Sequence, residues 1–287
     1  MTAYRFCRSD DIPLLVDALN RCWAPYFPDD PPITPASFKR SIRDLQVWCS
    51  SCMIAFAGSE PIGVLIGAKR PSGTLVHKIA VHPDHRQQGH GRHLLTSLSS
   101  KLAILGPPRI VSEVPDTLSA ARSLFSACGY VEEAVLTDYV LPREHQPALS
   151  ERGNAERVEG FVIPVTVEDL AANGLLGDAH TAACWERAVE TLTVRKDDIL
   201  GLAVASEERI EAYMLYLEDG EILSLRSFIN DGGARLKQLL TQLRTRGMAS
   251  FRVPKVHPAE TSNEPLETLG FRPAGVYLLY GARARSE

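Results

Sequence analysis

The sequence lacks any long hydrophobic run, because no stretch approaches the ~18 consecutive apolar residues that a membrane-spanning helix requires. Its beginning shows no basic segment leading into an apolar run, so we expect a cytoplasmic protein without a membrane partner. Cysteine is sparse, with 6 in 287 residues, and its scattered spacing excludes the dense disulfide framework of small secreted domains. Neither sign of charge dominates: the net charge of −4 gives no general attraction to nucleic acid.

What is present fits a globular protein of two domains. Hydrophobic residues make up 45% and charged residues 23% of a chain that is longer than the ~100–150 residues of a common domain. A polar stretch almost without large apolar residues follows residue 142 and reads as a linker. We therefore predict a first domain over residues 1–145, a linker over 146–160 and a second domain over 161–287.

Hydrophobic periodicity in the first half predicts a strand, two helices, a three-stranded antiparallel meander, and then helix, strand, helix and strand. The meander consists of Met53–Ala57, Ile62–Ala68 and Leu75–Val81, separated by turn residues. The second half repeats part of this pattern. Leu94, Leu95 and Leu98 have counterparts in Leu239, Leu240 and Leu243, and Gly129 has one in Gly270. The leucines and the glycines are separated from their counterparts by similar numbers of residues, which indicates a degenerate internal repeat.

The segment Val76–Leu95 carries the chemistry. It reads as a strand, a loop containing Gly89 and Gly91, and a helix whose first N–H groups and positive dipole end can bind phosphate. Arg86 and Arg92 make the loop locally positive on an acidic protein, which favours a polyanionic cofactor.

Strand, Arg-x-x-Gly-x-Gly loop and leucine-rich helix in this order resemble the acetyl-coenzyme A signature of the GNAT acetyltransferase superfamily. The segment Leu124–Tyr130 also resembles the family's closing Leu-Tyr-x-x-x-Gly-Phe. The resemblance implies an α/β (α+β) fold of two GNAT-like domains, each with a mixed, mainly antiparallel central sheet flanked by helices. It also implies that acetyl-CoA is the co-substrate. The pantetheine arm would lie on Ile79, Ala80 and Val81, and the pyrophosphate on Arg86, Gln87, Gln88, Gly89, His90, Gly91 and Arg92.

Two departures from the family pattern affect the mechanism. Phe125 stands where many relatives have a tyrosine that protonates the leaving thiolate, and Leu75 where many have a glutamate that deprotonates the amine. Direct attack by a neutral, well-positioned amine remains feasible. As substitutes we consider His77, expected to share a strand face with Leu75 and Ile79, and Glu113 in the next strand; the alternative for each is a structural role.

The resemblance predicts an N-acetyltransferase that moves acetyl from acetyl-CoA to a primary amine of a small molecule or peptide, by direct attack in a ternary complex. Tyr26 and Phe27, in a loop rich in proline and aromatics, are the predicted acceptor wall. The alternative is a non-catalytic acyl-CoA-binding or sensing protein. In the second half, Asp231 stands where the first half has arginines and would repel a pyrophosphate. That half is therefore expected to keep the fold without the cofactor, in a monomer or weak homodimer.

Two other patterns are set aside. Cys49-x-x-Cys52 resembles a redox motif, but here a helix precedes it and a strand follows, the reverse of the redox arrangement. Five histidines between His77 and His93 lack partners at a recognised ligand spacing, so we expect no metal.

Overall fold

The computed structural model describes residues 2–143, 160–177, 183–260 and 263–285. The described chain forms two compact units. The first consists of residues 1–134 together with 278–287, and the second of residues 135–277. This division differs from the predicted one, because the C-terminal residues belong with the first unit. The predicted linker lies outside the described residues except for Gly160.

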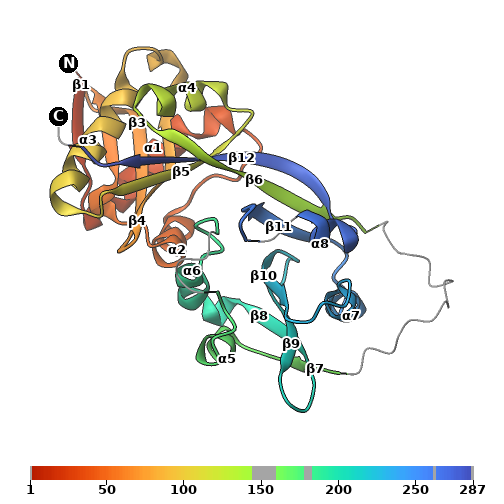
Figure 1. Ribbon diagram of the computed structural model, residues 1–287. Coiled ribbons are helices and arrows are strands. Elements are labelled where there is room, and N and C mark those ends of the chain that lie inside the picture. Colours follow the sequence, from red (N-terminus) through yellow and green to blue (C-terminus); the bar gives the residue numbers. More distant parts are fainter. Residues whose placement is uncertain (1, 144–159, 178–182, 261–262, 286–287) are drawn as a thin grey trace. The chain divides into compact units, whose positions relative to one another are not determined.

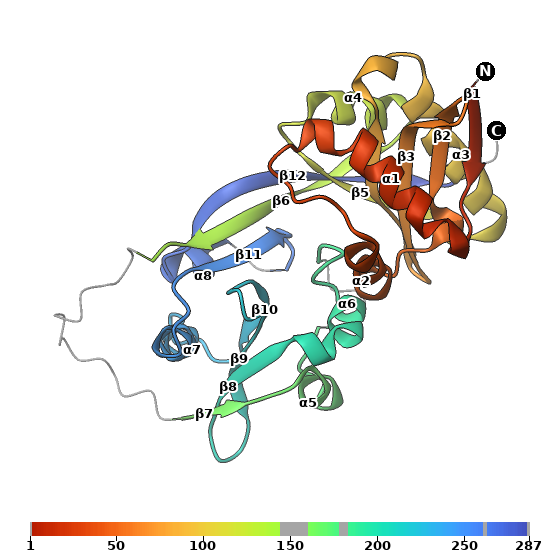
Figure 2. The same cartoon turned by 180° about the vertical axis from the view of Figure 1, so that it is seen from behind.

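The first unit has the predicted order of elements (Figure 1). Its sheet runs β1-β2-β3-β4-β5, followed by residues of β12 and β6. Neighbours from β1 to β4 are antiparallel, and β4 and β5 are parallel. Helices α1 and α3 cover opposite faces of this sheet (Figure 2). The elements are β1 (Thr2–Phe6), α1 (Ile12–Cys22), α2 (Pro35–Leu45), β2 (Met53–Ala57), β3 (Glu60–Arg70), β4 (Gly73–Val81), α3 (His90–Leu105), β5 (Arg109–Pro115), α4 (Ser119–Ala127) and β6 (Val131–Leu141).

Strand β12 (Arg272–Arg283) returns the end of the chain to the first unit. Its residues Leu278 and Tyr280 are buried in the core formed by α3, α4 and the first sheet. Beyond the strand, the Ala284 N–H donates to the Pro108 carbonyl at 2.6 Å, and the Arg285 N–H to Ser99 Oγ at 3.0 Å. The first unit is thus completed by the last residues of the chain.

The second unit repeats the order of the first in a reduced form. Strands β10, β9, β8 and β7 form an antiparallel sheet, and β11 pairs antiparallel with β6. Leu239, Leu240 and Leu243 are buried against these strands, as the repeat predicts. Trp185 is buried and lies in a turn that precedes α6. The elements are β7 (Phe161–Pro164), α5 (Val167–Ala172), α6 (Val189–Val194), β8 (Leu200–Ala205), β9 (Ile210–Tyr216), β10 (Ile222–Ser227), α7 (Ala234–Thr245), β11 (Phe251–Val256) and α8 (Asn263–Thr268).

None of the helices within the described ranges is long and apolar enough to cross a membrane.

Candidate active site

The site of the first unit begins where β4 and β5 separate. The two strands pair in parallel at two rows, Thr74 with Ile110 and Leu75 with Val111. The hydroxyl of Ser112 then donates to the Val76 carbonyl at 3.1 Å. Because β4 continues to Val81, its second half has an edge that faces away from β3 and is not paired with β5. An unpaired strand edge offers backbone N–H and C=O groups to an extended ligand.

A β-bulge lies at this point of β4. On β3, Ile66 pairs with Lys78 and the next residue, Gly67, pairs with Val76, so His77 is the extra residue. The bulge reverses the alternation of side chains. Ile79 packs with the cluster that contains Val76, whereas Leu75 pairs with Ala68, two residues after Ile66 on the other face. The expectation that His77 shares one face with Leu75 and Ile79 is therefore wrong.

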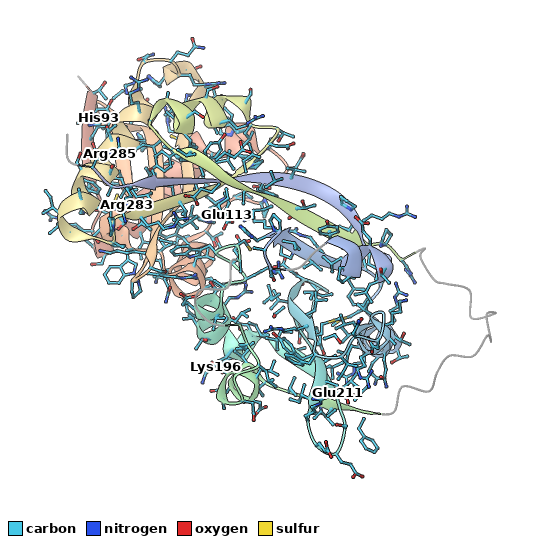
Figure 3. The ribbon with its side chains drawn as sticks, viewed as in Figure 1. His93, Glu113, Lys196, Glu211, Arg283 and Arg285 are labelled. Carbon is cyan, nitrogen blue, oxygen red and sulfur yellow. The ribbon has the colours of Figure 1, made fainter. Side chains whose placement is uncertain are left out.

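The two predicted proton-transfer residues each lie two residues past the last paired row of β4 and β5, which joins Leu75 to Val111: His77 on β4 and Glu113 on β5. Both side chains are half-buried, and Figure 3 labels Glu113 on β5. Neither lines the cavity described next. His77 and Glu113 thus lie near the point where β4 and β5 stop pairing, but outside the cavity.

A cavity of about 610 Å³ lies beside the end of β4, within the range typical of small-molecule sites. It includes every predicted cofactor residue except Gln88, and both predicted substrate residues. The sequence singled out Leu124 as part of a motif but not as a wall of this cavity, which α4 provides because Gly91 lets Leu124 approach. The lining residues are Trp23, Tyr26, Phe27, Ile79, Ala80, Val81, His85, Arg86, Gln87, Gly89, His90, Gly91, Arg92, Leu118, Ala120, Ala121, Ser123 and Leu124.

The glycine loop presents the N-terminus of α3 to this cavity. Gln87 and Gly89 both have positive φ, at 59° and 84°, a conformation that glycine adopts without strain. Gly89 is the N-cap, and no side chain caps the helix. A Cβ on Gly91 would lie 3.0 Å from Leu124, so this position also needs a small residue. The first-turn N–H groups of α3 are consequently available to an anion, with Arg86 and Arg92 beside them.

Aromatic side chains form the opposite wall. The Tyr26 hydroxyl donates to the Val81 carbonyl at 2.7 Å, and the Arg86 guanidinium lies 5.7 Å from the Tyr26 ring centre. Trp23 and Phe27 stack with ring centres 4.4 Å apart, and Lys78 Nζ lies 4.0 Å from the Trp23 ring centre. The contacts of Tyr26 and of Lys78 with Trp23 fix the loop after α1 against β4 and the glycine loop, and the stack of Trp23 on Phe27 orders the loop itself.

His90 is buried at the start of α3. A 2.6 Å hydrogen bond joins its Nδ1 to the Tyr4 hydroxyl. Burial, followed by the charges of His85 and His93, lowers its pKa. His90 is therefore neutral at neutral pH, and the positive charge of the loop comes from its arginines.

Phe125 does not reach the cavity. It is 1% exposed and lies in the core of the first unit, stacked on Tyr280 with ring centres 5.8 Å apart and edge-on to Tyr130 at 5.1 Å. The Tyr130 hydroxyl is also buried, and burial raises its pKa. Neither residue offers a proton to a ligand in the cavity.

Within the described ranges, no group of three or more His, Cys, Asp or Glu side chains is placed to hold a metal ion.

Comparison with known proteins identifies the class. Residues 48–132, which contain the meander, the glycine loop and all of α4, match the acetyltransferase (GNAT) domain family. A search of curated proteins gave no match. This match within the first unit supports an acyltransferase enzyme.

Solved structures resemble the whole chain. A GCN5-related N-acetyltransferase from Sphaerobacter thermophilus is 15% identical, with 99% of this chain and 96% of that chain covered and a TM-score of 0.67. A tandem GNAT protein from the clavulanic acid biosynthesis pathway is 14% identical, with full coverage of both chains and a TM-score of 0.66. A GCN5-related N-acetyltransferase from Anabaena variabilis is 11% identical, with 99% of this chain and 73% of that chain covered and a TM-score of 0.63. At these identities the likeness shows the fold, and the predicted tandem GNAT fold is confirmed.

Proposed function

We propose that the protein transfers an acetyl group from acetyl-CoA to a primary amine of a small molecule or peptide, in a ternary complex formed by the first unit. The observation that carries the proposal is the uncapped N-terminus of α3, which opens into the cavity beside the unpaired edge of β4. A diphosphate linked to an extended amide-containing arm matches both features.

The residues of the cavity fit coenzyme A in charge and shape. The N–H groups after Gly89, together with Arg86 and Arg92, would hold the pyrophosphate. The edge of β4 from Ile79 to Val81 would pair with the amides of the arm. The bound thioester supplies an activated acetyl group, and the protein's part is to hold the acceptor amine against its carbonyl carbon.

In the transfer, the amine nitrogen bonds to the acetyl carbon, the carbon–sulfur bond breaks, and the thiolate leaves with the electron pair. The amine loses one proton, and the thiolate gains one. We propose His77 and Glu113 as the groups that accept the amine proton, directly or through water, because both lie where β4 and β5 separate. Tyr26 and Phe27 would contact the acceptor.

Replacing His77 with alanine or Glu113 with glutamine tests these roles. General-base catalysis contributes about 10²–10⁴-fold, so loss of the operative base should lower kcat at least about 100-fold and leave the affinity for acetyl-CoA unchanged. Steady-state kinetics across pH would show the loss of one limb of the pH profile in that variant. Glu132→Gln, at an exposed carboxylate on β6, is the matched control. Unchanged kcat in either variant removes that residue from the mechanism.

The alternative function, acyl-CoA binding without catalysis, is favoured by the burial of Phe125. Free CoA released with any amine in a broad acceptor panel excludes this alternative. Tight acetyl-CoA binding without turnover across the panel would support it.

A further inference from the structure

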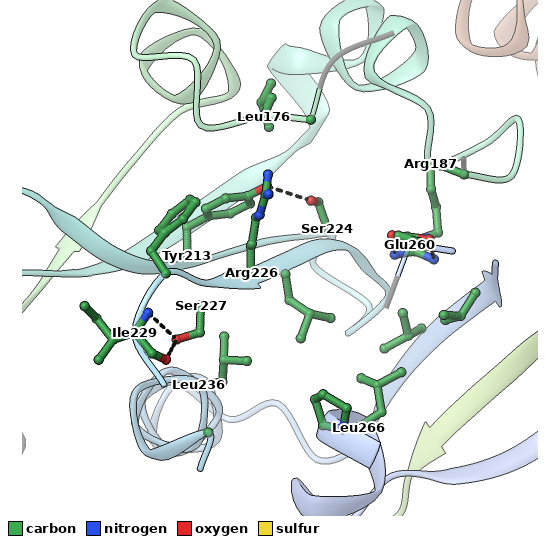
Figure 4. A pocket seen from close by; sticks show the side chains of 18 of the residues that line it. Leu176, Arg187, Tyr213, Ser224, Arg226, Ser227, Ile229, Leu236, Glu260 and Leu266 are labelled. Atoms are coloured by element: carbon green, nitrogen blue, oxygen red, sulfur yellow. Dashed lines mark hydrogen bonds and ion pairs between the residues drawn. The ribbon is translucent and has the colours of Figure 1, made fainter. Parts of the chain in front are cut away.

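The second unit has its own cavity of about 830 Å³, lined by β10, the loop before α7, β11 and α8 (Figure 4). This is the same succession of strand, glycine loop and helix that forms the cavity of the first unit. Gly233, in a left-handed conformation with φ of 83°, precedes α7 just as Gly89 precedes α3. The two cavities differ, however, in the charged groups that occupy them.

The helix N-terminus of this cavity is already occupied by a carboxylate. Asp231 accepts from the Gly233 N–H and from the Arg235 N–H, each at 3.0 Å. The Arg235 side chain donates to the same carboxylate at 2.8 Å and to Glu211 at 2.7 Å. An incoming phosphate would have to displace Asp231 and would be repelled by it. The N-terminus of α3 has no such cap.

The opening between β10 and β11 is occupied as well. Arg187 is 4% exposed; its Nε donates to the Leu223 carbonyl at 2.9 Å and its Nη1 to the Pro254 carbonyl at 3.2 Å. Its guanidinium also forms a two-pronged ion pair with Glu260. The side chain therefore bridges carbonyls of two strands at the place where, in the first unit, the unpaired edge of β4 lies. Breaking a buried ion pair of this kind by moving one partner away is costly, because it leaves the other charge buried and uncompensated.

Arg226 differs from Arg187 and Arg235 in its surroundings. In the part of the chain that the structure describes, Arg226 has no carboxylate within ion-pairing distance, and its guanidinium lies 5.4 Å from the Phe228 ring centre. The lining carboxylates of Asp231 and Glu260 are already paired with Arg235 and Arg187. Among the described residues that line the cavity, Arg226 thus carries a positive charge that is not balanced by a carboxylate.

Hydroxyl groups lie close to that charge. Tyr213 Oη and Ser224 Oγ are 3.1 Å apart, and both line the cavity with Arg226 (Figure 4). Apolar side chains also line this cavity, among them Leu176, Val189, Leu192, Leu225, Leu236 and Leu266. Cavities of about 300–1,000 Å³ with apolar walls and a few polar groups are typical of small-molecule sites.

We propose that the second unit binds a small acid with one negative charge and an apolar body, its anionic group on Arg226 and the Tyr213–Ser224 hydroxyls. Coenzyme A is excluded from this cavity because Asp231 and Arg187 occupy the positions that its diphosphate and arm would need. The site does not depend on acetyl transfer by the first unit.

Octanoate is a suitable probe, with octylamine as the cationic molecule of the same length. Calorimetry on the full chain is expected to show one octanoate site and no comparable octylamine binding. Because charge-assisted hydrogen bonds contribute about 1.5–3 kcal/mol, Arg226→Met should weaken octanoate about 10–100-fold. Arg209→Met, at an exposed arginine between β8 and β9, is the matched control and should bind normally.

Octanoate binding must also survive Gly89→Glu, which alters the first cavity only. The proposal is overturned if octanoate shows no saturable binding, if octylamine binds as well, if Arg226→Met has no effect, or if Gly89→Glu abolishes binding. Failure of acetyl-CoA binding in the first unit would leave the octanoate result unchanged, so the two proposals are tested separately.

Discussion

Replacing Gly89 with glutamate is expected to lower the affinity for acetyl-CoA at least about 100-fold. A Cβ at this position meets no atom within 4 Å, so the protein can accommodate the side chain. The new carboxylate would stand at the N-cap of α3, where the diphosphate binds in our proposal. Two unit charges about 4 Å apart repel by about 4 kcal/mol at an effective dielectric constant of about 20, which exceeds the about 2.7 kcal/mol of a 100-fold change. Isothermal titration calorimetry measures the effect.

Gly89→Ala separates charge from backbone strain in this experiment. The φ of 84° penalises any residue with a side chain, by about 1–2 kcal/mol, so both variants carry the strain and glutamate alone carries the charge. We expect Gly89→Ala to lower thermal stability slightly and to retain most of the affinity. Equal affinity losses in the two variants would contradict a diphosphate at the start of α3.

Replacing Tyr280 with alanine is expected to destabilise the first unit by about 3–5 kcal/mol, the cost of deleting a large buried aromatic side chain. Tyr280 is 3% exposed and stacks on Phe125 in the core of the first unit, although it lies seven residues from the C-terminus. Chemical denaturation, monitored by amide hydrogen exchange, would report the stability of each unit separately. The protection of the α3 and α4 amides against exchange should fall.

Arg283→Ala, at an exposed residue of the same strand, is the control and should leave the free energy of unfolding nearly unchanged. Loss of protection confined to residues 160–277 in Tyr280→Ala would instead mean that the last strand stabilises the second unit alone, as the predicted boundary at residue 161 implies.

The sequence predicts the first unit well because its signals are local. Met53–Ala57 agrees with the predicted strand residue for residue. Turn residues and apolar alternation determine such strands within a few residues of chain. The pairing of β12 with the first sheet could not be predicted in this way, since it joins Tyr280 to a core formed some 150 residues earlier.

The glycine loop before α3 could likewise be predicted, because its glycine spacing is visible in the sequence. The relation of His77 to its neighbours could not, because a single bulged residue in β4 reverses the alternation that the prediction assumed. In the second unit, Asp231 indicated a lost phosphate site from sequence alone. That Arg187 blocks the opening between β10 and β11 could not be predicted, because it depends on the carbonyls of Leu223 and Pro254, which only the fold brings together.

We propose that one unit of this tandem fold takes acetyl-CoA and the other does not. Titration of acetyl-CoA into the purified full chain by calorimetry tests this proposal most directly and requires no knowledge of the acceptor. We expect one site per chain, absent in Gly89→Glu. Two sites per chain, or a single site that persists in Gly89→Glu, would contradict it.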